Sequence, residues 1–326
     1  MLPNGEDVSV IICAYTEKRW EKLREAVASV QRQTVQPREI IIVIDYSPIL
    51  LKQVKEHIPN VIVVENTKAR GLRGARNCGV AIAQGQIIAF LDDDAVAIPD
   101  WLKLLCQGYA NVDVLGTGGG VIPSWEGSKP AWLSEEFYWV IGCSYRGMPE
   151  NSVTIRNPIG ANMSMRREVF VVAGDFHSEN VHLSKQHAGG CEETEICIRA
   201  HQYWPQRFFL YHPSAIVFHH VPQARVSWRY FFFRCYSEGL SKAILVHYVG
   251  AKDGLVSERT YTYKTLPHAI LQGLKDTLFR RDLTGLARAG AIIAGLAVTT
   301  AGYLVGRISV KVMHTSEHMD MNAVGA

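Results

Sequence analysis

Several features that would settle the class of this chain at once are missing from it. The seven cysteines form no CxxC pair and are odd in number, so a disulfide framework or a zinc ribbon is not expected and a reducing compartment is favoured. The 34 Lys and Arg residues barely outnumber the 31 Asp and Glu residues, which argues against a nucleic-acid partner. No signal-peptide pattern opens the chain, and no repeat or biased linker divides it.

Two enzyme classes lack their defining loops here. A dinucleotide-dependent dehydrogenase would carry GxGxxG after an N-terminal strand, whereas the GTGGG stretch at 116–120 comes too late and opens no clear helix. A nucleotidyltransferase, the closer enzyme alternative, would carry a glycine-rich, lysine-bearing loop where this chain reads CAYTEKRW. What is present is ordinary globular composition, with 48% hydrophobic residues, and a length of 326 residues that predicts about two domains.

Four short apolar runs, rich in β-branched residues, occur in the first hundred residues. They lie at 8–13, 40–44, 61–64 and 87–91, and helical periodicity at 17–33 and 74–84 separates them. Strands this apolar, alternating with helices, predict an α/β fold with a mostly parallel sheet covered on both faces. Such sheets bind ligands at the carboxyl ends of their strands, so the residues after each run are the candidates for chemistry.

Three adjacent carboxylates follow the fourth run, in the sequence FLDDD. Asp92, Asp93 and Asp94 repel one another, so a purely structural role needs a cation or many hydrogen-bond donors. Alternate side chains of an extended segment share a face, which lets Asp92 and Asp94 point the same way. Two carboxylates on one face suit Mg²⁺ or Mn²⁺, which would also bind the oxygens of a leaving diphosphate. The alternative is a solvated acidic turn that caps the following helix.

Polar residues also follow the other strands. Asp45 ends the second run and could accept hydrogen bonds from a base or a ribose, or merely form a turn. Thr16 and Glu17 follow the first run and could contact a nucleotide, although Thr16 also suits a helix N-cap. The segment KARGLRGARN, which contains Arg76, could approach a phosphate or a base, or form a solvated helix face.

Taken in order, these segments resemble an inverting family 2 glycosyltransferase with a GT-A fold. The matching text is VSVIICAYTE, REIIIVID and ENTKARGLRGARNCGVAIAQGQIIAFLDDDA, followed by NPIGANMSMRREVF, GCEETEICIRA and YHPSAIVFHH. The likeness covers about residues 6–220. It therefore predicts a GT-A catalytic domain at 1–220 and, outside it, a helical region at 221–326.

The resemblance implies a role for each matching position. Asp94 and Asp92 take the place of the family's metal-binding acidic motif, and His219, within the pair His219-His220, takes the place of a third metal ligand, although either histidine could simply pack. The metal would be Mg²⁺ or Mn²⁺. The residues implied to bind a nucleotide-sugar donor, with UDP as the nucleotide, are Ala14, Tyr15, Thr16, Glu17, Asp45, Arg76, Asp92, Asp93 and Asn162.

The pair Glu192-Glu193 takes the place of the family's Glu-Asp pair at a helix start. The second member resembles the base that deprotonates the acceptor hydroxyl, so Glu193 is the implied base, with Glu192 left open as the alternative. A carboxylate is needed there because an alcohol is a poor nucleophile at neutral pH. The other interpretation is a solvated acidic helix start, favoured by the helix dipole.

The composition of the last third of the chain suggests contact with a membrane. Residues 227–249 combine aromatic and cationic side chains, and residues 289–306 carry no charge between flanking arginines. This run is at the lower limit for crossing a bilayer, so it either contacts the membrane or forms a buried core helix. Membrane contact would favour a lipid-linked or polysaccharide acceptor and a cytoplasmic position at the inner face of the membrane. Four aromatic residues could stack on sugars or be core: Trp125, Trp132, Trp139 and Tyr145.

From another class, the chain could be a non-catalytic nucleotide-sugar-binding or scaffold protein on the same fold. The joint presence of Asp92, Asp94, Glu193 and His219 argues for the enzyme. The sequence leaves the donor sugar, the acceptor and the oligomeric state undetermined.

Overall fold

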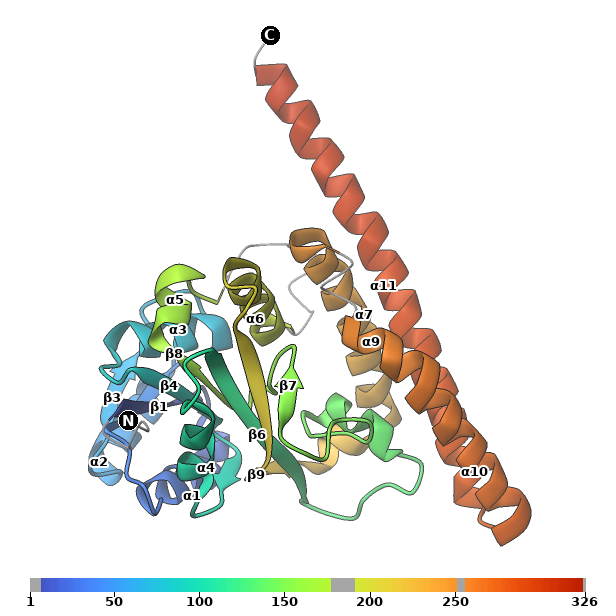
Figure 1. Ribbon diagram of the computed structural model, residues 1–326, viewed down its shortest axis with the longest axis horizontal. Coiled ribbons are helices and arrows are strands. Elements are labelled where there is room, and N and C mark those ends of the chain that lie inside the picture. The colour runs from blue at the N-terminus through green and yellow to red at the C-terminus, as the bar shows by residue number, and fades with distance from the viewer. Residues whose placement is uncertain (1–6, 177–190, 251–255, 325–326) are drawn as a thin grey trace.

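A nine-stranded mixed sheet organises the molecule, in a computed structural model that describes residues 7–176, 191–250 and 256–324 (Figure 1). Its strand order is β3-β2-β1-β4-β8-β6-β9-β5, and β7 pairs with β9. The strands are β1 (Val8–Ala14), β2 (Glu39–Ile44), β3 (Ile62–Glu65), β4 (Ile87–Asp92), β5 (Ala95–Ala97), β6 (Val114–Trp125), β7 (Val153–Ile155), β8 (Asn162–Arg166) and β9 (Phe208–Val221).

The predicted α/β fold is confirmed. The four apolar runs form β1 to β4, which pair in parallel, while β8 joins β4 and β6 in antiparallel fashion. Helices flank the sheet: η2 (Glu17–Arg19), α1 (Trp20–Gln31), α2 (Pro48–His57), α3 (Leu72–Ile82), α4 (Trp101–Gly108), η3 (Glu135–Ile141), α5 (Arg167–Val172) and α6 (Glu192–Tyr203).

The core lies on both faces of the sheet because successive strand residues point to opposite sides. Ile12 and Ile42 pack in one hydrophobic cluster, while Ile11 and Ile41 pack in the other. A strand that is buried on both faces needs an unbroken apolar run, and such a run is easily recognised in the sequence.

Two segments differ from what their local sequence suggests. The glycine-rich stretch at 116–120 lies inside the long strand β6, where strand β9 of the same chain passes close to it. A Cβ atom on Gly119 would lie 1.8 Å from the carbonyl oxygen of Ala215. Residues 208–221 form one continuous strand, β9, although Pro213 lies inside it, and an irregularity in the pairing of β9 with β6 accommodates this proline.

Helices make up the chain after β9. They are η4 (Gln223–Val226), α7 (Trp228–Val249), α9 (Val256–Thr260), the π-helical η5 (Tyr261–Thr265), α10 (Leu266–Arg280) and α11 (Leu283–Val324). Figure 1 shows α10 and α11 along the side of the molecule away from β1 to β3, with α11 extending well beyond the sheet. The division into domains at residue 220 stays a prediction.

Helices α7 and α11 pack with their backbones in close approach. A Cβ atom on Gly239 of α7 would lie 2.1 Å from the carbonyl oxygen of Thr299, and one on Gly302 of α11 would lie 2.3 Å from that of Tyr236. Because neither glycine can carry a side chain here, the separation of the two helices is fixed by these small residues.

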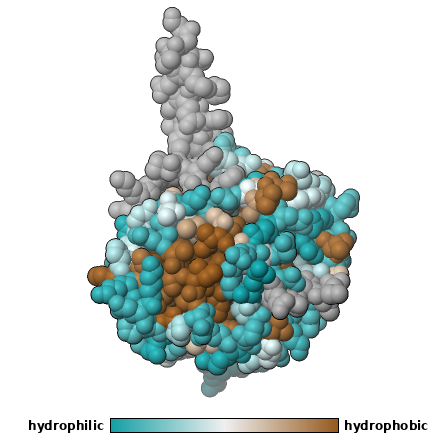
Figure 2. Space-filling model, turned by 90° about the vertical axis from the view of Figure 1, so that its left-hand side faces the viewer, coloured by the Kyte–Doolittle hydropathy of each residue, from teal (hydrophilic) through white to brown (hydrophobic). Residues whose placement is uncertain are grey.

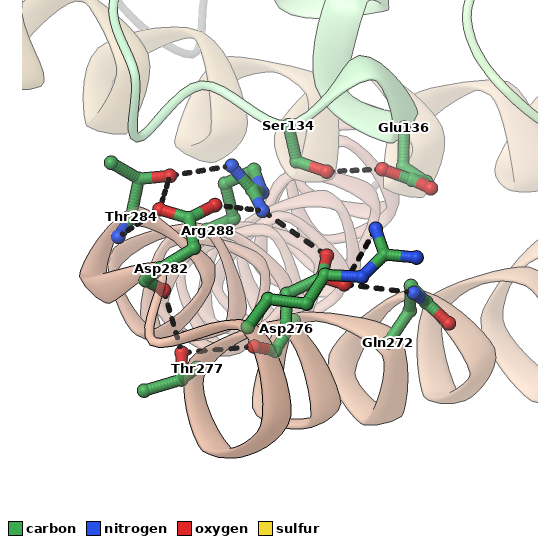
Figure 3. Close-up of polar contacts among 10 residues, drawn as sticks. Ser134, Glu136, Gln272, Asp276, Thr277, Asp282, Thr284 and Arg288 are labelled. Atoms are coloured by element: carbon green, nitrogen blue, oxygen red, sulfur yellow. Dashed lines mark hydrogen bonds and ion pairs between the residues drawn. The ribbon is translucent and has the colours of Figure 1, made fainter.

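The turn between α10 and α11 is held by a polar cluster (Figure 3). Arg288 of α11 pairs with Asp276 of α10 at 3.3 Å and with Asp282 of the turn at 3.2 Å. The Thr284 hydroxyl donates to Asp282 at 2.6 Å. These contacts make α10 and α11 one antiparallel hairpin.

Hydrophobic side chains remain exposed on this hairpin. An 18-residue window within Leu283–Ser309 has a mean hydropathy of 1.6, and 33% of that window is buried, so by length and composition alone this segment could cross a membrane. Leu271, Leu278 and Phe279 of α10 are exposed as well. A second apolar patch, framed by hydrophilic residues, appears in Figure 2 on the opposite side of the molecule, where Figure 1 places α2 and β3.

The close approach of α7 and α11 predicts opposite effects for two glycine substitutions. Gly239→Ala should lower the free energy of unfolding by about 1–3 kcal/mol because the new methyl group overpacks the helix contact. Gly290→Ala on α11, where nothing lies within 4 Å of the new Cβ atom, should raise it by about 0.5–1 kcal/mol through helix propensity. Chemical denaturation measures both, and equal shifts would contradict the packing described here.

Candidate active site

The acidic residues lie where β4 ends and turns into β5. Asp92 is the last residue of β4, and Asp93 and Asp94 form the turn that follows. Strand β5 pairs with β9 so that Ala95 stands opposite His219. This register brings His219 Nε2 to 3.1 Å from Asp94 Oδ1. Possible metal-ligating atoms of Asp92, Asp94 and His219 all lie within 4.8 Å of one another.

Two arginines that the sequence did not single out compensate this negative charge. The guanidinium of Arg19 lies 2.8 Å from Asp93 Oδ1 and 3.1 Å from Asp94 Oδ2. Arg225, from η4, lies 3.8 Å from Asp94 Oδ2. Burial nevertheless raises the pKa of Asp93 to about 7, and its buried Oδ2 atom has no hydrogen-bond partner among the described residues.

Asp94 and His219 form a buried ion pair. Burial disfavours both charges, yet the hydrogen bond between them and the nearby arginines hold the pKa of Asp94 below its usual range. The same hydrogen bond overcomes the effect of burial and raises the pKa of His219. The Nδ1 atom of this imidazole faces the Cys143 sulfur at 3.7 Å, so both ring nitrogens have partners and the ring orientation is fixed.

Arg76 connects α3 to the acidic turn. Its buried guanidinium lies 3.6 Å from Asp92 and donates to the carbonyl oxygen of Gly160 at 3.0 Å. It also faces the rings of Phe90 and Phe176 at 5.7 and 5.6 Å. A guanidinium that stacks on rings and binds a carboxylate at once is well fixed in position.

Asp45 lies at the carboxyl end of β2, beside the loop that leads into α3. Its carboxylate accepts hydrogen bonds from Asn66 Nδ2 at 2.7 Å and from the backbone N–H of Gly71 at 3.0 Å. A carboxylate has about four acceptor positions, so Asp45 can still accept a hydrogen bond from a ligand.

Glu192 and Glu193 begin α6, after a residue, Cys191, with a φ of 70°. Burial and the neighbouring charge of Glu192 raise the pKa of Glu193 to about 7. A buried Oε2 atom of Glu192 has no hydrogen-bond partner in the described parts of the chain, and Arg73 lies 3.9 Å from it. Both carboxylates thus lie in surroundings that favour a bound partner.

One cavity of about 950 Å³ brings most of the predicted site residues together. It is lined by Ala14, Tyr15, Asp45, Arg76, Asp92, Asp93, Asp94, Glu192, Glu193 and His219. Trp139 and Tyr145 also line it, whereas Trp132 stacks on Trp228 with ring centroids 4.0 Å apart and Trp125 packs edge-on against Tyr138.

Three of the predicted donor-binding residues do not line this cavity. The Thr16 hydroxyl accepts a hydrogen bond from the N–H of Lys18 and caps η2, and Glu17 accepts one from the Ser47 hydroxyl at 2.5 Å. The side chain of Asn162 is fully buried, donates to the carbonyl oxygens of Gly120 and Ala215, and accepts from Trp101. Asn162 therefore links β8, β6 and β9 in the core.

Comparison with known proteins identifies the class of this molecule. The family model described as glycosyl transferase family 2 matches residues 9–172. The chain is 31% identical, over 93% of its length and 96% of the relative's, to a glucosyl-dolichyl phosphate glucuronosyltransferase of Haloferax volcanii. It is 39% identical, over 27% of its own length and 36% of the relative's, to the Escherichia coli UDP-Glc:alpha-D-GlcNAc-diphosphoundecaprenol beta-1,3-glucosyltransferase WfaP.

A solved structure shares the fold. The mannosyltransferase PcManGT from Pyrobaculum calidifontis, in complex with GDP-Man and Mn²⁺, superposes with a TM-score of 0.56 at 19% identity, covering 90% of this chain and 87% of that one. The fold is thus of the GT-A type. The chain belongs to glycosyl transferase family 2 and is a glycosyltransferase.

Proposed function

We propose that this glycosyltransferase moves a sugar from a nucleotide donor, with UDP as the nucleotide, to a hydroxyl of a lipid-linked or polysaccharide acceptor, in a metal-dependent reaction that inverts the anomeric centre. The observation that carries the proposal is the shared cavity. It joins the cluster of Asp92, Asp94 and His219 to Asp45 on one side and to Glu193 on the other.

The donor set of the cluster fits a divalent cation. Two carboxylates and one imidazole suit Mn²⁺, and Mg²⁺ would use the two carboxylates together with phosphate oxygens and water. Held by Asp92, Asp94 and His219, such an ion would neutralise the charge that develops on the leaving diphosphate. The solved GT-A relative contains Mn²⁺, which supports this assignment.

The residues around the cluster would position the donor. Asp45, at the end of β2, would accept a hydrogen bond from the nucleoside, next to Ala14 and Tyr15 at the end of β1. Arg19 and Arg225 lie beside Asp94 and would contact the diphosphate, where their charge is complementary to the phosphate oxygens. The donor's sugar would then point into the cavity.

Glu193 would act as the base. Its carboxylate lines the cavity and would take the proton of the acceptor hydroxyl as the new glycosidic bond forms and the bond to the diphosphate breaks. A base whose pKa lies near the working pH is the most effective, and the raised pKa of Glu193 meets this requirement. Glu192 would maintain the raised pKa of Glu193 through its own charge.

A lipid-linked acceptor agrees with the C-terminal helices. The names of the Haloferax and Escherichia relatives both describe lipid-linked substrates. In this chain the α10–α11 hairpin exposes Leu271, Leu278 and Phe279 beside Arg280 and Arg281, a pattern suited to the surface of an anionic membrane. The enzyme would work at the cytoplasmic face of that membrane.

The metal assignment predicts that His219→Ala weakens Mn²⁺ binding by at least about tenfold, as loss of a group that holds a metal does. The neighbouring His220→Ala variant is the matched control and should bind like the wild type. The affinity of the wild type for Mn²⁺ should also rise with pH, because His219 must lose its proton before it can bind the ion. Titration calorimetry with Mn²⁺ measures this, and wild-type affinity in His219→Ala would refute the assignment.

The base assignment predicts the pH profile of sugar transfer. Because the pKa of Glu193 is about 7, kcat/KM should fall about tenfold per pH unit below that pH as the carboxylate takes up a proton. Glu193→Gln should lose transfer by about 10²–10⁴-fold. Glu192→Gln should keep activity and move the decline to lower pH, since a negative neighbour is removed. An unchanged pH profile in Glu192→Gln would show that the charge of Glu192 does not raise the pKa of Glu193.

The donor is identified by screening nucleotide sugars for Mn²⁺- or Mg²⁺-dependent hydrolysis, and we expect a UDP-sugar to be turned over. Asp94→Asn should abolish this turnover while the fold is retained, with the exposed Asp100→Asn as the matched control. Binding of UDP with no hydrolysis or transfer for any sugar would favour a non-catalytic binding protein instead.

A further inference from the structure

Helix α7 forms one wall of the cavity. Four of its residues recur at every fourth position and all line it: Tyr230, Arg234, Glu238 and Lys242. Residues four apart lie on the same face of a helix, so α7 presents one polar stripe to the cavity. All four lie outside the segment that the family model matches.

The stripe connects the two chemical ends of the site. At its start, η4 leads into α7 and places Arg225 beside Asp94 at 3.8 Å. At its far end, Glu238 lies 3.7 Å from the sulfur of Cys191, the residue that precedes Glu192. A substrate that reaches from the acidic cluster to Glu193 therefore passes along α7.

The charges at the far end of the stripe are balanced by one another. Lys242 lies 2.7 Å from Glu258 and 3.4 Å from Glu238. Glu258 also pairs with Arg156, through contacts of 2.8 and 3.0 Å. These contacts tie α7 and α9 to the turn before β8, and they pair the charges of Lys242, Glu258 and Arg156 with one another.

Arg234 differs from these residues. It is half-buried, it lines the cavity, and it has no hydrogen bond or ion pair within the described ranges of the chain. A guanidinium in such a place binds phosphate well, because its fork of donors matches two phosphate oxygens. The ligand that occupies this part of the cavity should therefore bring an anion.

The position of Arg234 distinguishes two sources of that anion. The donor's diphosphate would lie at the acidic cluster, where Arg19 and Arg225 already stand. Arg234 lies one turn of α7 beyond Tyr230, about 6 Å along the helix axis in the direction of Glu238. Phe233 and Leu296 line the cavity as well, so the group attached to this second phosphate would be apolar.

We propose that Arg234 binds the phosphate of an acceptor in which that phosphate joins a sugar to a lipid. The sugar would extend past Glu238 towards Glu193, and the first units of the lipid would lie against Phe233 and Leu296. This inference rests on the proposed function, names the class of its acceptor, and assigns Arg234 as a specificity-determining residue.

Binding of geranyl phosphate, which needs no knowledge of the sugar, tests the inference on the full-length chain in detergent. The wild type should bind it with saturation, and Arg234→Gln should weaken binding by at least about tenfold, the usual effect of removing one partner of a charge-assisted hydrogen bond. Arg234→Lys should recover part of the loss because it keeps the charge. Arg229→Gln, at an exposed position of the same helix, is the matched control.

Three further ligands separate the possible sources of the phosphate. Geraniol should bind Arg234→Gln and the wild type alike, inorganic phosphate should bind the wild type more weakly than geranyl phosphate, and UDP with Mn²⁺ should be unaffected by the substitution. The inference is overturned if geranyl phosphate does not bind the wild type or binds both proteins equally. It is also overturned if inorganic phosphate binds as well as geranyl phosphate, or if UDP loses as much affinity in Arg234→Gln.

Turnover of nucleotide sugars, measured in the same preparations, keeps the two proposals apart. If the wild type turns over a nucleotide sugar in a metal-dependent reaction but does not bind geranyl phosphate, the acceptor assignment alone is refuted. The absence of any turnover would refute the proposed function itself.

Discussion

The concentration of negative charge at the end of β4 is the constraint on which the site depends. Three consecutive carboxylates at the end of a buried strand must be compensated or they would repel one another. The compensating groups are Arg19, Arg76, His219 and Arg225, which come from η2, α3, β9 and η4. The acidic turn therefore brings together elements that lie about two hundred residues apart in the sequence, from Arg19 to Arg225.

Strands β1 to β4 could be predicted from their apolar runs, whereas the pairing of the long strands β6 and β9 could not. Strands β1, β2 and β4 are buried on both faces, so each is an unbroken apolar run that is recognisable in the sequence, and the edge strand β3 is more exposed but still begins with three apolar residues. In β6 and β9 the sequence is constrained by contacts between these two strands instead, as the close approach of Gly119 to Ala215 shows. The position of His219 opposite Ala95 depends on this long-range pairing, and only the resemblance to a family pointed to it.

Local sequence also cannot tell which way a polar residue points. Asp45 and Asn162 both stand at strand ends, yet Asp45 lines the cavity while Asn162 satisfies buried carbonyl groups in the core. Arg19 was overlooked because an arginine near the start of a helix is usually solvated, and nothing in TEKRW marks it as a partner of residues more than seventy positions away.

The two halves of the cavity are built by different physical means. One side is formed by the ends of the parallel strands β1, β2 and β4, whose spacing is fixed by backbone hydrogen bonds. Another side is formed by α7 and α11, whose spacing is fixed where Gly239 and Gly302 each meet the backbone of the other helix. Side chains on these helices lie outside the core of the sheet, which agrees with the proposal that α7 selects the acceptor while the strand ends bind the donor. Arg234 lies on the side of the cavity that α7 and α11 form.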